Sequence, residues 1–284
     1  MVSMKGAIDI DVLELTKNRV KLLIKNAPLP LVNAVRRAAL EEVPKMAVDY
    51  VVVRTNTSIL HDEIIAHRLA MIPLKSEEAI RKYRPPEDCK DKDALYREGC
   101  YTTLYLEYET GDNEVKTLYS EDLKPIDDPD VKPVSGKIPI VMLGPNQRIA
   151  LEAKARLGRG REHIKWAPAT VSILTYVPKI DVDMSKCVNC GVCATYCPTG
   201  ALSISEGKLV VEEDKCNLCR QCIRVCEYDA IRLSWYEDMY YLVVESDGSM
   251  SPETIVMEAI KEIIKKLDKL AEILKAEAPQ EVKV

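Results

Sequence analysis

Apolar and polar residues alternate along several stretches of the chain with the two-residue period of β-strands. Near the start, apolar residues occupy alternate positions at Ile8, Ile10 and Val12 and again at Val20, Leu22 and Ile24. The polar run Thr16-Lys17-Asn18 separates the two sets. Because this period on both sides of a polar turn is typical of paired strands, residues 7–25 are predicted to form a hairpin.

Further strands and one short helix are predicted from the same kind of pattern. Strands are expected at 50–54, 149–157, 171–177, 231–236 and 239–245, the last two separated by a turn at Glu237-Asp238, together with a hairpin over 101–119 that turns at residues 111–113. Asp62 is expected to cap a short helix that Pro73 ends. The Pro- and Asp-rich residues 124–137 predict a surface loop.

Residues 28–43 show the three- to four-residue period of a helix. One face gathers Leu31, Val35, Ala38 and Ala39, and small side chains there permit the close approach of another helix. Val43-Pro44 ends the pattern, because proline disfavours a helical conformation of the residue before it.

A second, longer helix is predicted near the end of the chain. Ser251-Pro252-Glu253 provides a capping serine, a proline at the first helical position and an acid near the positive end of the helix dipole. Apolar residues follow in steps of three and four over about 24 residues, or about 36 Å. They are Val256, Ile260, Ile263, Ile264, Leu267, Leu270, Ala271 and Leu274. A face this long ordinarily packs in its own core, and here we expect it to extend into a partner protein as well.

Composition is that of a globular protein. The 284 residues suit two or three domains, and 47% hydrophobic with 30% charged residues suit a chain with a substantial core. The formal net charge of −5 implies no general attraction to nucleic acid. No apolar run approaches about eighteen residues, and the first residues begin a strand pattern without a signal sequence, so a cytoplasmic location is expected.

Eight of the ten cysteines form a repeated motif. Cys187, Cys190 and Cys193 are followed by Cys197 and Pro198. The same spacing returns 29 residues later as Cys216, Cys219, Cys222 and Cys226. Gly191 in the first loop lets the backbone pass close to sulfur, and residues 202–211 are predicted to form a hairpin that turns at Glu206-Gly207.

Two such loops suit a pair of cubane iron–sulfur clusters. Each loop provides three thiolates, and the fourth comes from the distant cysteine of the other loop. The predicted ligands of one [4Fe-4S] cluster are Cys187, Cys190, Cys193 and Cys226. Those of the second are Cys216, Cys219, Cys222 and Cys197.

Residues 181–232 therefore resemble the bacterial two-cluster ferredoxins. The second loop departs from that pattern, with Arg220 where the first has Gly191 and Glu227 where it has Pro198. A zinc ribbon would use pairs of cysteines separated by a longer spacer. A disulfide scaffold is not expected in a chain without an export signal.

Two features lie outside the cluster motif. Cys89 and Cys100 are left over, and both a pair of reduced thiols and a disulfide remain open for them. The segment Leu157-Gly-Arg-Gly-Arg-Glu-His-Ile-Lys-Trp166 is basic and contains glycine. No strand–loop–helix with a terminal Lys-Ser or Lys-Thr surrounds it, so a contact with a protein partner or a solvated turn is expected in place of a phosphate cradle.

Five segments together carry a family resemblance. They read Asn33-Ala-Val-Arg-Arg-Ala, His67-Arg-Leu-Ala-Met-Ile-Pro-Leu, Ser135-Gly-Lys-Ile-Pro-Ile-Val, the basic segment from Leu157 to Trp166, and Val244-Glu-Ser-Asp-Gly-Ser. In combination they resemble the D-type, alpha-like subunit of archaeal DNA-dependent RNA polymerase. That family is related to the N-terminal domain of the bacterial alpha subunit and to the third-largest eukaryotic subunit.

The resemblance implies an α+β fold built on an alpha-subunit-like dimerisation domain, which is split over residues 1–47, 171–180 and 233–284. An α+β domain would be inserted at 48–170, and a ferredoxin-like domain with two [4Fe-4S] clusters at 181–232. The implied role is non-catalytic: a heterodimer with the small subunit L on which the large catalytic subunits assemble, with the clusters structural or regulatory. The implied partners include the small subunits N and P and the second-largest catalytic subunit, with DNA reached only through the complex and no membrane partner.

Other function classes are weaker. The cluster motif alone favours a ferredoxin-like electron-transfer protein or oxidoreductase subunit, but no flavin or dinucleotide fingerprint accompanies it. Direct binding of nucleic acid through residues 154–165 depends on five basic side chains in an acidic chain. His61, His67 and His163 lie far apart with no nucleophile motif or aspartate-rich magnesium loop nearby, so no catalytic residue is expected.

Overall fold

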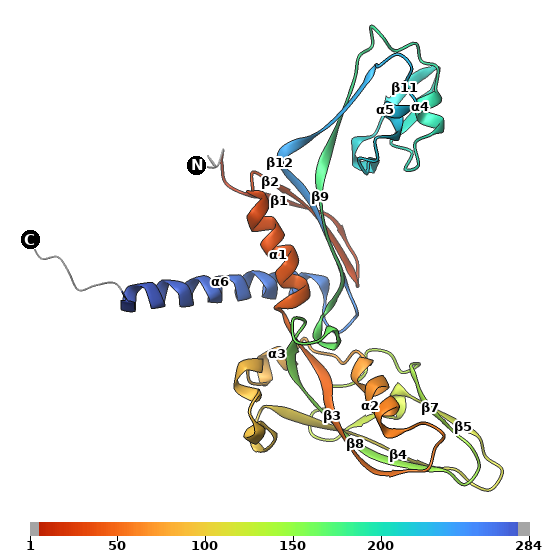
Figure 1. Ribbon diagram of the computed structural model, residues 1–284, viewed down its shortest axis with the longest axis vertical. Coiled ribbons are helices and arrows are strands. Elements are labelled where there is room, and N and C mark those ends of the chain that lie inside the picture. Colours follow the sequence, from red (N-terminus) through yellow and green to blue (C-terminus); the bar gives the residue numbers. More distant parts are fainter. Residues whose placement is uncertain (1–5, 278–284) are drawn as a thin grey trace, which may run out of the picture. The chain divides into compact units, whose positions relative to one another are not determined.

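The computed structural model describes residues 6–277 (Figure 1). Within them the chain forms two compact units. The first comprises residues 6–13, 21–32 and 173–242, and the second comprises residues 14–20, 33–172 and 243–277.

The first unit contains most of a four-stranded sheet. Its strands are β1 (Asp9–Leu15), β2 (Arg19–Lys25), β9 (Ala169–Val182) and β12 (Ile231–Ser246), in the order β1-β2-β12-β9. The predicted hairpin over residues 7–25 is confirmed, and its turn is closed by a hydrogen bond of 2.8 Å from the Thr16 amide to the Arg19 carbonyl.

Strand β12 corrects one prediction. It runs unbroken through Glu237-Asp238, where a turn between two strands was expected. That pair lacks the glycine, proline or asparagine that favours a tight turn. It is flanked by aromatic residues that suit a pleated surface. Tyr176 on β9 packs against Trp235 and Tyr240 of β12, with ring centroids 5.4 Å apart in each pair.

Between β9 and β12 the first unit forms a small cysteine-rich fold. Strands β10 (Leu202–Ser205) and β11 (Lys208–Val211) pair antiparallel, which confirms the predicted hairpin. Its turn residues Glu206 and Gly207 have φ values of 52° and 74°, as a type I′ turn requires. The short helices α4 (Val192–Thr195) and α5 (Gln221–Arg224) each follow a cysteine loop, and a 3₁₀ turn spans Glu213–Lys215.

The second unit is built on two further sheets. In the larger sheet the strands are β3 (Pro44–Asn56), β8 (Arg148–Arg159), β4 (Tyr101–Glu109) and β6 (Lys124–Pro125), in the order β3-β8-β4-β6. The smaller sheet pairs β5 (Lys116–Tyr119) with β7 (Pro139–Leu143). The helices are α1 (Leu29–Glu41, of which residues 33–41 belong here), α2 (Asp62–Met71), α3 (Ala79–Lys82) and α6 (Pro252–Glu277). Single 3₁₀ turns lie at Pro86–Cys89, Lys92–Tyr96, Ser120–Asp122 and Ile164–Trp166.

The core of the second unit lies against one face of the larger sheet. On β8 the inward residues Leu151, Ala153 and Ala155 are fully buried, while Glu152 and Lys154 between them are partly exposed. This two-residue period confirms the strand predicted there. Helix α2 adds Ile65 and Leu69 to the same core.

The predicted hairpin over residues 101–119 is wrong. Both strands exist, but β4 pairs with β8 and β6, and β5 pairs with β7. The segment between them is tied to a distant loop, because the Thr110 hydroxyl donates to the Gly144 carbonyl at 2.6 Å and the Asn146 amide donates to the Gly111 carbonyl at 3.2 Å. The alternation of apolar and polar residues in a strand predicts which face is buried, but it does not determine which other strand pairs with it.

Two local predictions also need correction. Asp62 is the first residue of α2 and not its cap, because the N-cap is His61. The Asp62 carboxylate accepts a hydrogen bond of 2.7 Å from the side-chain amide of Asn56. Residues 124–137 are only partly a surface loop. They contain the paired strand β6, and Val131 is fully buried.

Helices α1 and α6 agree with their predicted limits. Helix α1 ends at Glu41, just before Val43-Pro44. At the start of α6 the Thr254 amide donates to the Ser251 hydroxyl at 3.2 Å, which confirms the capping serine. The first three turns of α6, residues 252–263, contain its buried positions and are called the α6 root below. Residues 264–275 are exposed throughout.

Candidate functional site

The two cysteine loops adopt the same unusual backbone conformation. Two and four residues after its first cysteine, each loop turns to positive φ: Asn189 (55°) and Gly191 (76°) in the first, Leu218 (61°) and Arg220 (62°) in the second. Left-handed residues alternating with right-handed ones point successive N–H groups into one concavity, which favours a negatively charged group such as an iron–sulfur cluster. Arg220 thus takes the conformation of Gly191, at a cost of about 1–2 kcal/mol for a residue with a Cβ.

The similarity continues past the loops. Helices α4 and α5 follow at equivalent positions, and a third left-handed residue follows each fourth cysteine: Gly200 (68°) and Asp229 (48°). The 29-residue repeat in the sequence is therefore a structural repeat.

One hollow of about 380 Å³, part of it open to solvent, brings together four of the predicted ligands. They are Cys187, Cys190, Cys193 and Cys226. Its other walls are mainly apolar and include Val192, Ile204 and Leu209. Three thiols of the first loop and the last thiol of the second thus surround one space.

The other four cysteines are also neighbours. Burial raises the pKa of the Cys216 thiol, and the thiols of Cys219 and Cys197 raise it further. Burial likewise raises the pKa of the Cys222 thiol, beside the Cys216 and Cys219 thiols. Cys197 differs: burial acts in the same direction, but hydrogen bonds from backbone amides, the Leu202 amide first, outweigh it and lower the pKa of its thiol.

The donors present fit iron–sulfur clusters. All eight thiols are free, and soft sulfur ligands with an apolar surround are what such clusters use. Among residues 6–277, no three Cys, His, Asp or Glu side chains form a site for a single metal ion. A cubane does not need such a site, because each thiolate bonds a different iron at a different corner.

The basic segment 157–166 is in part a packing element, since Leu157, Gly158, Arg159 and Trp166 are buried. Its turn at residues 160–162 and the side chains of His163 and Ile164 face solvent in part, so the expected solvated turn is present and the partner contact stays a prediction. Gly158 lies under the Trp166 ring, where an added Cβ would come within 2.3 Å of ring carbon Cδ2. Gly160 lies against the backbone of Leu40, whose carbonyl oxygen would be 2.0 Å from such a Cβ. Arg156 and Lys165 stack on the Trp166 ring, 4.4 and 4.2 Å from its centroid.

Each of the five basic residues in 154–165 is paired with a carboxylate. The pairs are Lys154 with Glu152, Arg156 with Asp49 and Glu162, Arg159 with Glu87 and Glu262, Arg161 with Glu42 and Glu87, and Lys165 with Asp49. A nucleic acid would have to displace these carboxylates. The pairing disfavours direct binding of nucleic acid through this segment.

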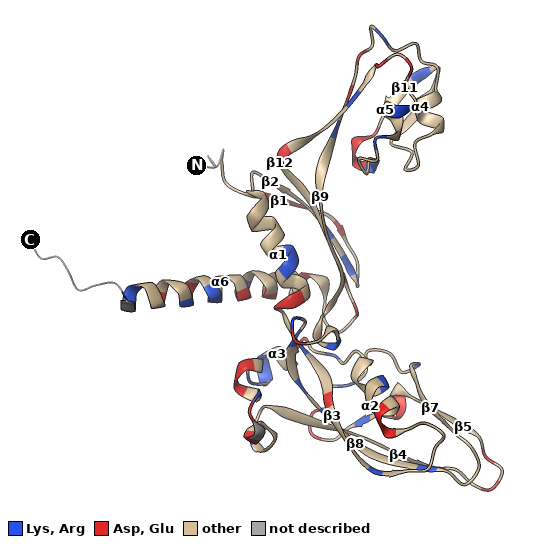
Figure 2. Ribbon diagram, in the orientation of Figure 1, with Lys and Arg blue, Asp and Glu red and all other residues tan. Residues whose placement is uncertain are grey.

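The exposed half of α6 carries an apolar stripe. It comprises Ile264, Leu267, Leu270, Ile273 and Leu274, which are 44–61% exposed. Basic and acidic positions alternate along the rest of the helix (Figure 2), with ion pairs such as Lys261–Glu258 at 2.6 Å. Charged residues cover the remaining faces, so the apolar stripe is confined to one side.

This stripe continues into a groove between α1 and α6. The groove, an open hollow of about 840 Å³, is lined by Ala34, Arg37, Ala38, Glu41, Glu42, Glu262, Ile263, Lys266, Leu267 and Leu270. Lys266 bridges to Glu42 at 2.6 Å. Small residues on α1, Ala34 and Ala38, leave room beside the apolar side chains of α6.

The remaining sequence candidates are dispersed. His61 occupies the N-cap position of α2 without a capping hydrogen bond from its side chain, and His67 lies on the exposed side of that helix. His163 accepts a hydrogen bond of 3.1 Å from the Lys165 amide. In the part of the chain that the structure describes, no helix is long and apolar enough to cross a membrane.

Comparison with known proteins gives matches along nearly the whole chain. The family model of the RNA polymerase Rpb3/RpoA insert domain matches residues 51–174, and two models of a 4Fe-4S binding domain match residues 180–203 and 208–231. These matches, with the mixed helices and strands described above, confirm the predicted α+β class with its insert and ferredoxin-like parts.

Whole-length relatives carry the name DNA-directed RNA polymerase subunit Rpo3. The protein of Aeropyrum pernix is 38% identical, over 97% of this chain and 98% of its own length. That of Methanosarcina acetivorans is 36% identical, over 94% of this chain and 98% of its own length. That of Pyrobaculum aerophilum is 36% identical, over 93% of this chain and 95% of its own length.

Proposed function

The chain belongs to the archaeal family of DNA-directed RNA polymerase subunit Rpo3, and from this premise we propose that it is a non-catalytic assembly subunit of the polymerase. Two independent sets of findings agree with the role: relatives that match nearly the whole chain, and a structure in which helix α6 exposes a stripe of large apolar side chains. The electron-transfer alternative is not favoured, because the polymerase relatives account for the chain outside the cysteine loops as well as within them.

The observation that carries the proposal is the exposed half of α6 beside the α1 groove. Five large apolar side chains form an exposed stripe along this helix. Burying each of them would stabilise a complex by about 1.5–3 kcal/mol, so an exposed stripe of this size indicates a binding surface. We propose that the small subunit L covers this stripe and groove. The small subunits N and P and the second-largest catalytic subunit would then bind the heterodimer, and DNA would be reached only through the complex.

Co-purification with the small subunit tests this interface. The Leu267 side chain is 59% exposed in the isolated chain. The variant Leu267→Glu would place an unpaired carboxylate in the buried interface, at a cost of several kcal/mol. We expect affinity for the small subunit to fall at least about hundredfold. The matched control, Lys269→Glu, places a carboxylate on another face of the same helix and should bind as wild type. Equal binding by both variants would exclude the stripe as the interface.

The domain organisation is part of the proposal. The dimerisation domain would comprise residues 1–47, 171–180 and 233–284, with the inserted domain at 48–170 and the ferredoxin-like domain at 181–232. The insert-domain model at 51–174 and the two 4Fe-4S models within 180–231 support this division. We place the assembled enzyme in the cytoplasm.

We also propose two [4Fe-4S] clusters, each held by three cysteines of one loop and the fourth of the other. The shared hollow of Cys187, Cys190, Cys193 and Cys226 and the repeated left-handed loops support these ligands. The fold between β9 and β12 has few buried apolar residues, so the clusters would act by holding it together.

Iron and sulfide analysis tests the ligand sets. The anaerobically purified chain should contain about eight iron atoms, and Cys226→Ser and Cys197→Ser should each retain about half. Electron paramagnetic resonance of the reduced variants should show different single-cluster spectra. Full iron content in both variants would exclude the crossed arrangement.

A further inference from the structure

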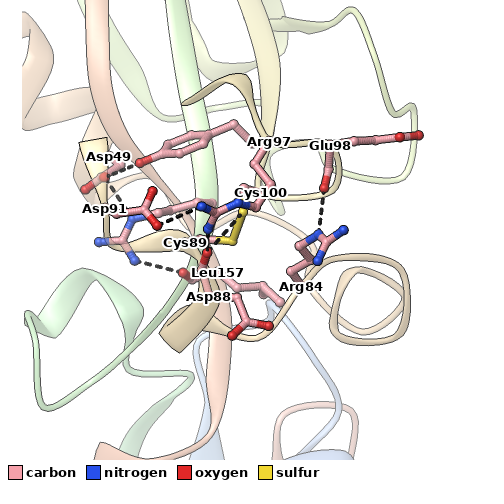
Figure 3. Close-up of a disulfide and its surroundings, with 11 residues drawn as sticks. Asp49, Arg84, Asp88, Cys89, Asp91, Arg97, Glu98, Cys100 and Leu157 are labelled. Atoms are coloured by element: carbon pink, nitrogen blue, oxygen red, sulfur yellow. Dashed lines mark hydrogen bonds and ion pairs between the residues drawn. A yellow bond between two sulfur atoms is a disulfide. The ribbon is translucent and has the colours of Figure 1, made fainter. Parts of the chain in front are cut away.

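A disulfide between Cys89 and Cys100 closes a small loop in the second unit (Figure 3). Both cysteines are nearly inaccessible, at 2% and 1% exposure. The sequence left this bond open, and the structure forms it. One 3₁₀ turn ends at Cys89 and a second, Lys92–Tyr96, lies inside the loop, which has no strand or longer helix.

The loop has little else to hold it. Its buried apolar cluster consists of the two cysteines and Ala94, with Tyr101 packed beside them. The polar contacts lie at the surface. Arg97 donates to the Asp91 carboxylate at 2.7 Å and to the Asp88 carbonyl, and Arg84 donates to the Glu98 carbonyl at 2.9 Å (Figure 3). Lys90 pairs with Glu162 at 3.1 Å, and the Arg84 amide donates to the Gly99 carbonyl at 2.8 Å. Exposed pairs contribute little, and so small an apolar cluster does not offset the entropy of ordering a dozen residues. The disulfide is therefore the main constraint on the loop.

Glu87, two residues before Cys89, joins this loop to a buried ion-pair network. Its carboxylate accepts two hydrogen bonds from Arg159, at 2.8 Å from Nε and 3.2 Å from Nη2. The Arg159 side chain is 7% exposed, and its Nη1 lies 2.8 Å from a carboxylate oxygen of Glu262 in the α6 root. The Glu262 side chain is itself 6% exposed.

One guanidinium thus connects the disulfide loop to the α6 root. Burial raises the pKa of the Glu87 carboxyl, but the hydrogen bonds from Arg159 outweigh this, so that pKa is lowered overall. Without Glu87, two buried N–H groups of Arg159 would lose their acceptors, and such groups are costly to leave unpaired. Water would replace Glu87, and the guanidinium would be held only through Nη1, which donates to the Glu42 carbonyl and pairs with Glu262, so its orientation toward Glu262 would be less constrained.

We propose that the Cys89–Cys100 disulfide is a redox-sensitive clamp on the α6 root, acting through Glu87 and Arg159. A dithiol reductant transfers two electrons and two protons to the bond, which leaves two cysteine thiols and the oxidised, cyclic disulfide of the reductant. The loop then opens, Glu87 leaves Arg159, and the Arg159–Glu262 contact weakens. The clamp is a property of this chain alone and does not depend on what covers α6.

Hydrogen–deuterium exchange of the full-length chain tests the clamp, with and without dithiothreitol under anaerobic conditions. We expect reduction to accelerate exchange in residues 252–263 about fivefold, the change produced by losing one net hydrogen bond. Residues 104–109 of β4 are the internal reference and should not change. The double variant Cys89→Ser/Cys100→Ser should reproduce the acceleration without reductant.

The variant Glu87→Gln tests whether the effect of the disulfide reaches the α6 root through Glu87 and Arg159. With the disulfide intact, this variant should accelerate exchange in the α6 root by itself, and reduction should add nothing further there. Four results would overturn the proposal. They are two alkylatable thiols in the unreduced chain, a bond that resists the dithiol until the whole chain unfolds, an open loop with unchanged α6 exchange, and a full additional effect of reduction in Glu87→Gln.

Discussion

Replacing Gly158 by alanine tests whether the basic segment is a packing element. The added Cβ would lie 2.3, 2.4 and 2.7 Å from three atoms of the Trp166 ring, closer than any real Cβ contact. The ring cannot move to relieve this overlap, because Trp166 is 4% exposed and Arg156 and Lys165 stack on it. The φ angle of Gly158 is not left-handed, so the whole effect is steric.

The expected cost is at the upper end of overpacking, about 3 kcal/mol. For a unit of this size it corresponds to a fall in Tm of roughly 6–12 °C. Calorimetric melting of the two glycine variants measures it. Gly111→Ala is the matched control, because its Cβ would have no atom within 4 Å and its φ is not left-handed. A Gly158→Ala melting temperature within about 2 °C of the control would refute the close contact with Trp166.

Two further predictions concern backbone strain and pH. Arg220→Gly should raise the urea concentration at the midpoint of iron release. It removes left-handed strain of about 1–2 kcal/mol, and the greater entropy that glycine loses on folding offsets roughly half of this gain. A lowered midpoint would show that Arg220 is not strained. The pKa of Asp49 is lowered although burial alone would raise it, because Arg156 and then Lys165 stabilise the carboxylate. A folded pKa below the unfolded one adds stability above the unfolded value and loses it as pH falls through the folded value. Asp49→Asn should therefore be less stable than wild type at pH 7, with a difference that shrinks below about pH 4; urea unfolding at several pH values measures this, and a difference that grows in acid would contradict it.

Local patterns predicted the parts of the fold that local physics determines. The first hairpin, the limits of α1, the serine cap of α6 and the turn at Glu206-Gly207 each depend on residues within a few positions of one another. The cysteine spacing is local in the same way. It fixed which thiols come from one loop, and the family resemblance supplied the surrounding domains.

Long-range pairing explains the failures. Strands β4 and β5 have suitable periods, but their partners β8 and β7 come from later in the chain, and no local signal identifies them. The buried part of residues 157–166 was not predicted, because the carboxylates that neutralise Arg159 and Lys165, such as Glu262 and Asp49, are distant in sequence. The structure extends the strand predicted at 149–157 to Arg159, so Gly158 lies inside it, where a glycine indicates the close approach of another group.

The central claim is that this chain acts in assembly and that its clusters act through folding. The most direct test is a polymerase purified with Cys226→Ser in this subunit, with cluster content, assembly yield and specific activity measured on the same preparation. The account predicts about half the iron, a lower yield of assembled enzyme, and unchanged activity per assembled molecule. An enzyme that has lost a cluster, assembles in full yield and is less active per molecule would contradict it.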